Sequence, residues 1–162
     1  MIKQTSLVWD TTFTTWETTG EVFNTTANTF ENVAFDRVLD NLALLLSNEF
    51  YAPVFYDEHK GNQSFLLQLL EDTLIDVFPA MQTRQYSVSI EHRLLNSGRY
   101  EKNQVKQMSE TNERVKRLIR NNITLSNGWH HGRIVSNTIE RNEELLTNVM
   151  QFQCRTIEMS SI

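Results

Sequence analysis

The chain has 162 residues, 40% of them hydrophobic, and a formal net charge of −5. This length fits one domain with its own core, and no apolar run is long enough to span a bilayer. The single cysteine, Cys154, excludes an intrachain disulfide and a cysteine-rich metal site, as expected for a protein made in a reducing cytoplasm without a signal peptide.

Charge is distributed unevenly along the sequence. Residues 1–80 carry three basic and twelve acidic side chains, a net −9, whereas residues 81–162 carry twelve basic and eight acidic ones, a net +4. Such asymmetry can steer head-to-tail association between copies of one molecule. The alternative is that the charges only solvate different faces.

Residues 1–31 contain a seven-residue repeat and predict an extended, threonine-rich arm. An acidic or amide residue follows each aromatic anchor, and two threonines come next in the first three units. The anchors are Trp9, Trp16, Phe23 and Phe30. Threonine disfavours helix, which argues against a coiled coil. Exposed aromatic rings are costly, at about 1.5–3 kcal/mol each, so the anchors need pockets on this domain or on a neighbouring subunit.

Residues 32–162 predict one α+β domain. Apolar residues at three-and-four spacing predict a helix over 32–47, with Asn32 as its N-cap. Pro53 forbids continuation of this helix, and residues 52–56 predict a short strand. Residues 64–70 fit either a strand or a helix, and we expect a strand followed by a loop to Gln82.

The second half predicts three further strands and one helix. Strict alternation over 84–95 indicates a strand with one buried and one wet face. A second amphipathic helix is expected over 104–121, stopped by Asn121-Asn122, and strands over 131–140, with Val135 and Ile139 inward, and 146–157. The expected architecture is one antiparallel or mixed sheet of about five strands with two helices on one face.

The sequence carries no recognisable catalytic constellation. Cys154 lies on the apolar side of an alternating strand, as a buried thiol does, and the neighbours His130 and His131 should point to opposite faces. Asp57-Glu58-His59 reads as a solvated turn, although it could bind a cation. We therefore predict no enzyme, no metal and no cofactor; an enzyme would have to use these histidines with a metal.

The basic residues of the second helix form the other candidate site. Arg114, Lys116, Arg117 and Arg120 cluster there and could contact DNA or an acidic subunit. A solvated helix face is the alternative, because the chain is acidic overall and has no groove-reading motif.

The order of these elements, read with their residues, resembles the phage tail terminator and head-to-tail joining (tail completion) proteins. The similarity covers about residues 32–158 and rests on pattern. Its segments are Asp36–Leu39, Pro53–Glu58, Gln85–Glu91, Glu113–Ile119, Trp129–Ile134 and Phe152–Arg155.

The resemblance implies a structural virion protein at the tail–neck junction. Identical copies, typically six, would form a ring that ends the tail tube, contacts tube and neck proteins, and lets DNA pass through its lumen. The aromatic arm is not part of the compact family pattern and suggests an added clamp on a neighbour. The competing interpretation is an adaptor or nucleic-acid-associated binding protein without catalytic activity.

Overall fold

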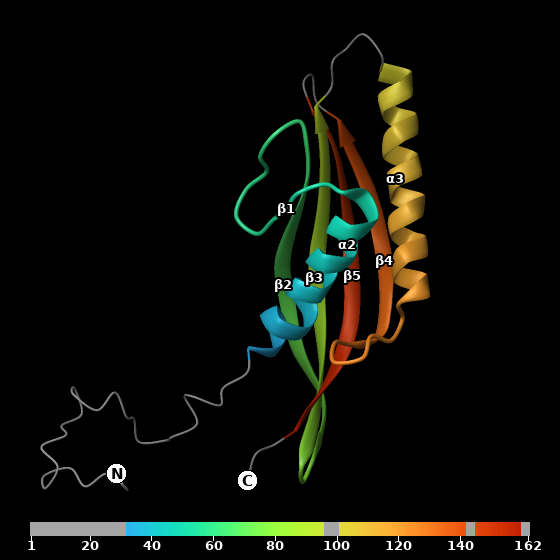
Figure 1. The fold of residues 1–162 in the computed structure, drawn as a ribbon. Helices are drawn as coiled ribbons and strands as arrows, with labels where there is room; N and C mark the ends of the chain where they lie inside the picture. The colour runs from blue at the N-terminus through green and yellow to red at the C-terminus, as the bar shows by residue number, and fades with distance from the viewer. Residues whose placement is uncertain (1–31, 96–100, 142–144, 160–162) are drawn as a thin grey trace, which may run out of the picture. The chain divides into compact units, whose positions relative to one another are not determined.

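The computed structural model describes residues 32–95, 101–141 and 145–159 of the chain (Figure 1). The four arm anchors lie outside the described residues. The elements in chain order are η2 (Ala34–Leu39), α2 (Asp40–Phe50), β1 (Val54–Phe55), β2 (Gln63–Phe78), β3 (Met81–Leu95), α3 (Glu101–Asn121), β4 (His130–Arg141) and β5 (Leu145–Met159).

The strands form one mixed five-stranded sheet in the order β1-β2-β3-β5-β4. Only the short β1 runs parallel to its neighbour, pairing Val54 with Phe65, and the other pairs are antiparallel. Both helices cover the same face of the sheet (Figure 1). The α+β fold predicted from the sequence is therefore confirmed.

The first helix begins where the sequence predicts. The side chain of Asn32 accepts a hydrogen bond from the backbone N–H of Phe35, and Asp36 accepts one from the N–H of Asn32. These reciprocal bonds satisfy amides that a helix start leaves free. The first six residues wind as a π-helix before α2 continues to Phe50.

The core lies between the helices and the sheet. Its members come from both helices and the three central strands and are almost fully buried; they include Leu42, Leu46, Phe65, Val88, Ile90, Val115, Ile119, Met150 and Phe152. The opposite face of β3 was expected to be wet, but Ser87 and Ser89 are buried there. Ser87 and Ser89 pair with Gln153 and Gln151 on the neighbouring strand β5, and these longer side chains shield them from water.

The predicted loop from residue 71 to Gln82 is wrong. β2 continues without interruption to Phe78, and only Pro79 and Ala80 form the turn into β3. Two register shifts, between Leu69 and Glu71 and between Leu74 and Asp76, break the apolar alternation along the strand. Each shift moves the pattern by one residue, so the sequence loses the period that identifies a strand.

The inward placement on β4 is wrong for Val135, whereas Ile139 lies on the core-facing side of the sheet as expected. Both side chains are about half exposed, whereas Ile134 packs against the core. The register shift between His130 and Arg133 turns Ile134 toward the core and Val135 away from it. The second shift, between Ile134 and Ser136, reverses the faces again, so Ile139 lies opposite the buried Asn148.

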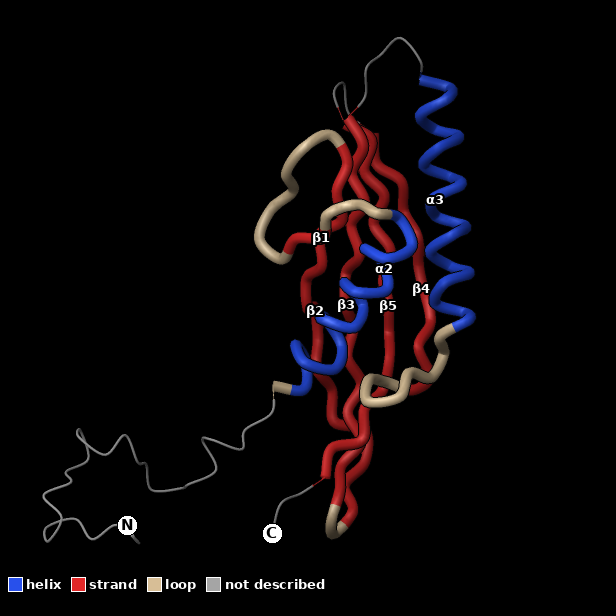
Figure 2. The backbone as a smooth tube through the Cα atoms, viewed as in Figure 1, coloured by secondary structure: helices blue, strands red, loops and turns tan. Residues whose placement is uncertain are grey.

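A turn leads from the end of α3 into β4 (Figure 2). The buried Trp129 fixes this turn. Its indole nitrogen donates a hydrogen bond to the carbonyl of Asn122 at 3.0 Å, and its ring meets Phe152 edge-on at 5.1 Å. A β-carbon at Gly132 would lie 2.5 Å from the indole nitrogen. The indole therefore fits only because residue 132 has no side chain.

We expect the substitution Gly132→Ala to lower the free energy of unfolding by about 1–3 kcal/mol, the usual cost of overpacking. Chemical denaturation would measure it, with the exposed Ser136→Ala of the same strand as the matched control. Equal stability of the two variants would contradict the packing described.

Candidate functional site

The four basic residues singled out on the second helix do not form one patch. The buried stripe of α3 includes Val115 and Ile119. Because a helix turns about 100° per residue, Lys116 and Arg120 lie on one flank of that stripe and Arg114 on the other. Arg117 points outward, into solvent. The structure thus brings together only two of the four residues.

Arg114 has a structural contact. Its guanidinium donates hydrogen bonds to the carbonyl of Glu49 at 2.9 Å and to its carboxylate at 3.2 Å, and it lies 4.5 Å from the centre of the Phe50 ring. These bonds join α3 to the end of α2. Arg114 is thereby engaged inside the domain and is a poor candidate for a partner contact.

The outward side of α3 carries charges of both signs. Lys106, Glu110, Glu113 and Arg117 share this side and are exposed. Hydrogen bonding to Lys116 at 2.9 Å, and the nearby cations, lower the pKa of Glu113. A face of mixed sign does not favour a continuous contact with phosphates.

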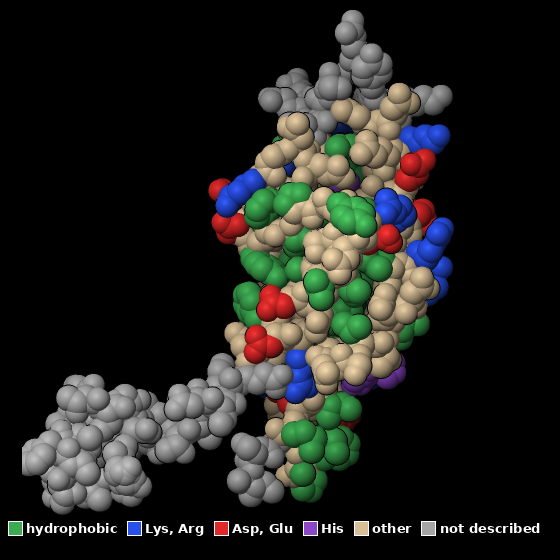
Figure 3. Space-filling model, in the orientation of Figure 1, with side chains coloured by type: hydrophobic (Ala, Val, Ile, Leu, Met, Phe, Trp, Pro, Cys, Tyr) green, Lys and Arg blue, Asp and Glu red, His purple; other side chains and the backbone are tan. Residues whose placement is uncertain are grey.

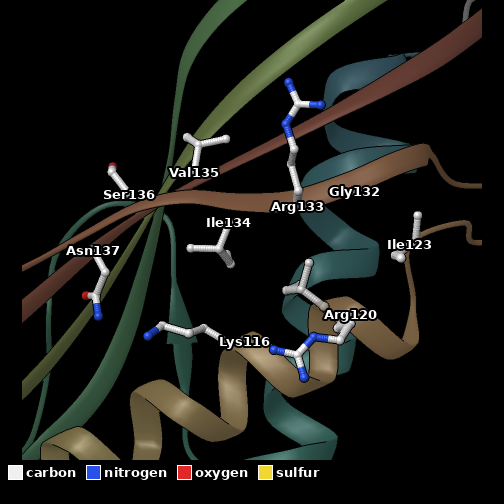
Figure 4. A pocket seen from close by; sticks show the side chains of 10 residues that line it. Lys116, Arg120, Ile123, Gly132, Arg133, Ile134, Val135, Ser136 and Asn137 are labelled. Carbon is white, nitrogen blue, oxygen red and sulfur yellow. The ribbon is translucent and has the colours of Figure 1, made fainter.

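Lys116 and Arg120 line a groove between α3 and β4 (Figure 4). The groove encloses about 430 Å³, and a run of residues on β4 forms its other side. Its lining residues are Lys116, Ile119, Arg120, Ile123, Gly132, Arg133, Ile134, Val135, Ser136 and Asn137. Ile134 and Asn137 point toward the helix, and Val135 and Ser136 point away from it (Figure 4).

The groove combines an apolar floor with a basic rim. Ile119 is buried and Ile134 half-buried, while Ile123 is 48% exposed. Lys116 pairs with Glu113, and Arg133 donates to the side chain of Gln153 at 3.1 Å. Arg120 forms no ion pair with an acidic residue in the described part of the chain. Sequence reasoning found Lys116 and Arg120 but missed Arg133 and Ile134, because the bulges of β4 that orient these two residues leave no periodic signal.

A second surface, the β tip, consists of residues 74–83 and 157–159. Every residue from Gln68 to Met81 is exposed. The register places Phe78, Met81 and Met159 in one row across three strands, and Val77 is 67% and Met159 70% exposed. Figure 3 shows these hydrophobic side chains gathered at one end of the domain.

Polar contacts hold the three strands together where the tip begins. Glu158 accepts hydrogen bonds from Tyr86 at 2.9 Å and from Gln82 at 3.0 Å, and Arg84 pairs with Asp72 at 2.8 Å. Burial and the bond to Glu158 raise the pKa of Tyr86. These contacts therefore hold the tip in place as a continuation of the sheet.

His59 is not in a solvated turn as expected. Its ring is buried between Ser64, 2.7 Å from Nδ1, and Glu91, 3.1 Å from Nε2. Burial lowers the pKa of His59, although the bond to Glu91 opposes the shift. Ser64, His59 and Glu91 form a chain of contacts with the residue types of a catalytic triad, an arrangement that suggests nucleophilic catalysis. However, Ser64 is fully buried, so a substrate could not reach its oxygen, and the contact instead fastens the loop before β2.

The remaining candidates also differ partly from expectation. His130 and His131 lie together rather than on opposite faces, with their Nδ1 atoms 2.7 Å apart, because His131 adopts a positive φ of 56° within the bulge. Cys154 is buried as expected, and burial raises the pKa of its thiol to about 12.

No family model matches the chain, and no curated protein sequence matches it either. Within the described ranges, no helix has the length and apolar character to cross a membrane. In those same ranges, no three histidine, cysteine or acidic residues lie close enough together to hold a metal ion.

His92 provides a test of the packing between α3 and the sheet. It is fully buried, stacked on Phe65 with ring centres 4.8 Å apart, and its Nδ1 lies 3.1 Å from the sulfur of Met108. Burial, with a smaller contribution from the charge of His59, lowers the pKa of His92 from 6.5 to about 4.

We expect His92 to destabilise the fold as the pH falls. Between pH 6.5 and 4 the unfolded chain takes up a proton that the folded chain does not, so the free energy of unfolding falls with decreasing pH, by about 3 kcal/mol at most. His92→Gln should flatten this dependence in denaturant titrations across that range. An unchanged slope would contradict the buried, neutral state.

Proposed function

We propose that this protein is a non-enzymatic structural protein of a phage virion. It forms a closed ring of identical copies at the tail–neck junction, where it ends the tail tube and joins the tail to the head. The observation that carries the proposal is the β tip, an apolar extension of the sheet that reaches beyond the helical layer.

The tip needs a partner to remove its side chains from water. Contiguous exposed apolar patches of this kind mark interaction sites in soluble proteins. Phe78 is half exposed, and Val77 and Met159 more so, on strands whose positions the Glu158 and Arg84 contacts fix. Docking would bury these side chains without first ordering the backbone, which reduces the entropic cost of association.

The sheet also offers two open edges on opposite sides. β1 covers β2 only at Phe65 and Leu66, and β4 has no strand beyond it in the described part of the chain. β2 carries three acidic and no basic residues, whereas β4 carries two arginines and one glutamate. Edges of opposite charge favour a heterologous contact, and such a contact repeated by rotation closes into a ring.

Ring formation and DNA passage belong to the same proposal. A ring of six is the number that the family resemblance implies, with the tail tube and neck proteins as its partners. The mixed charges on the outward side of α3 would not hold DNA tightly, which suits a molecule that DNA slides past.

The combined substitution Val77→Gln and Phe78→Gln should abolish assembly while leaving the fold intact, because both side chains are exposed in the single copy. Sedimentation velocity would follow the oligomer, and circular dichroism the fold. The matched control is Leu44→Gln on α2, also exposed and far in sequence from the tip. Assembly by the tip variant equal to that of the control would contradict the proposal.

The role in the particle needs a separate readout. Electron microscopy of particles made without the protein should show tailless heads beside free tails. Intact joined particles in its absence would refute the tail–neck assignment, whatever the oligomeric state of the purified protein.

A further inference from the structure

The groove between α3 and β4 has the chemistry of a binding site for an aromatic side chain beside a carboxylate. Ile119 and Ile134 form an apolar floor, and the exposed Ile123 extends it at the open end. Arg120 stands at the rim and forms no ion pair with an acidic residue in the described ranges, and Lys116 lies one turn away. Its volume of about 430 Å³ falls in the range of ordinary ligand sites.

The sequence of this chain contains a matching ligand in several copies. Three of the four arm anchors are followed directly by an acidic residue: Trp9-Asp10, Trp16-Glu17 and Phe30-Glu31. Residues 1–31 hold one basic and four acidic side chains, so the arm is acidic as a whole. An indole on the isoleucine floor would bring the neighbouring carboxylate to Arg120, where a charge-assisted hydrogen bond can form.

The number of anchors points to more than one molecule. The groove between α3 and β4 is a single site, whereas the arm carries four aromatic anchors at seven-residue spacing. In an extended chain, seven residues span about 23 Å, so successive anchors reach well beyond a single groove. An arm that served only its own groove would need one anchor.

We infer that the groove between α3 and β4 binds the aromatic–acidic units of the arm of a second copy. This inference rests on the proposed assembly and names the contact by which the arm joins one copy to the next. The ring of the anchor lies on Ile119, Ile123 and Ile134, and the carboxylate pairs with Arg120. Arg117, which points away from the groove, takes no part.

A peptide titration tests the groove directly. The probe is a fluorescent peptide of residues 6–20, which carries the Trp9 and Trp16 units. The receptor is the full chain with the four anchors changed to alanine, so that its own arm does not compete. Arg120→Glu should weaken binding about tenfold, as the loss of one well-placed ion pair would. Ile123→Asp should weaken it at least as much.

Matched controls distinguish binding in the groove from a general effect of positive charge on the helix. Arg117→Glu changes the same charge on the same helix outside the groove and should leave the affinity unchanged. A peptide with both tryptophans replaced by alanine should not bind. Equal losses for Arg117→Glu and Arg120→Glu, or none for either groove variant, would overturn the inference.

A mixing experiment decides whether the arm reaches a second copy. The four-anchor alanine variant keeps the groove and lacks the anchors, and the Arg120→Glu, Ile123→Asp double variant keeps the anchors and lacks the groove. Mixed, they should form a complex in sedimentation that neither forms alone. Two separate species, with peptide binding intact, would mean that each arm occupies its own groove and would overturn the second-copy contact.

The outcomes also separate this inference from the proposed function. If the groove variants assemble as the wild type does while the tip variant does not, the groove inference fails and the ring proposal stands. If the four-anchor alanine receptor binds the peptide but particles made without the protein join heads to tails normally, the tail–neck proposal fails and the groove contact remains.

Discussion

The structure depends on a difference in length between the strands of the sheet and the helices that pack on one face of it. β2 has 16 residues and β3 and β5 have 15 each, so these strands reach about 50 Å. The longest helix, α3, has 21 residues and reaches only about 32 Å. A helix on one face cannot bury strands that outrun it. The uncovered end is the β tip. Its exposed Leu74 and Val77 lie on the helix side of the sheet beyond the helices, and Phe78, Met81 and Met159 lie on the opposite face, which neither described helix covers.

The groove has a separate origin, in the two bulges of β4. These shifts turn Ile134 toward the helix and Val135 away from it, and the buried Trp129 fixes the turn that leads into the strand. α3 packs mainly through Val115 and Ile119. The flank of the helix that carries Lys116 and Arg120 is therefore separated from the edge strand β4 by the groove. A regular strand would have placed Val135 under the helix and closed the space.

The sequence predicted those elements whose pattern is local. The Asn32 cap, the stripe of α3 and the alternation of β3 and β5 each depend on neighbours within a few residues, and their positions were right to within about three residues. The far half of β2 could not be found in this way. Its pairing partners, such as Arg84 for Leu74 and Met81 for Phe78, identify it as a strand only when β3 is laid beside it.

The candidate site was predicted in part for the same reason. A cluster of basic residues on a helix is visible in the sequence, but its division into the Arg114 bridge, the Lys116–Arg120 flank and the outward Arg117 depends on which stripe is buried. The burial of His59 likewise depends on Glu91, which is 32 residues away in the chain. Contacts over such separations have no counterpart in residue spacing.

The two surfaces would contribute different things to an assembly. Burial of the tip side chains removes apolar area from water, so it supplies affinity that depends little on ionic strength. The rim of the groove acts through Arg120, whose attraction to a carboxylate is screened over about 8–10 Å at physiological salt. A partner that satisfied only the tip could slide or rotate on it, because apolar contact has no preferred direction. A charged, shaped groove on another side of the same domain fixes the angle between copies, and a fixed angle is what turns repeated association into a closed ring.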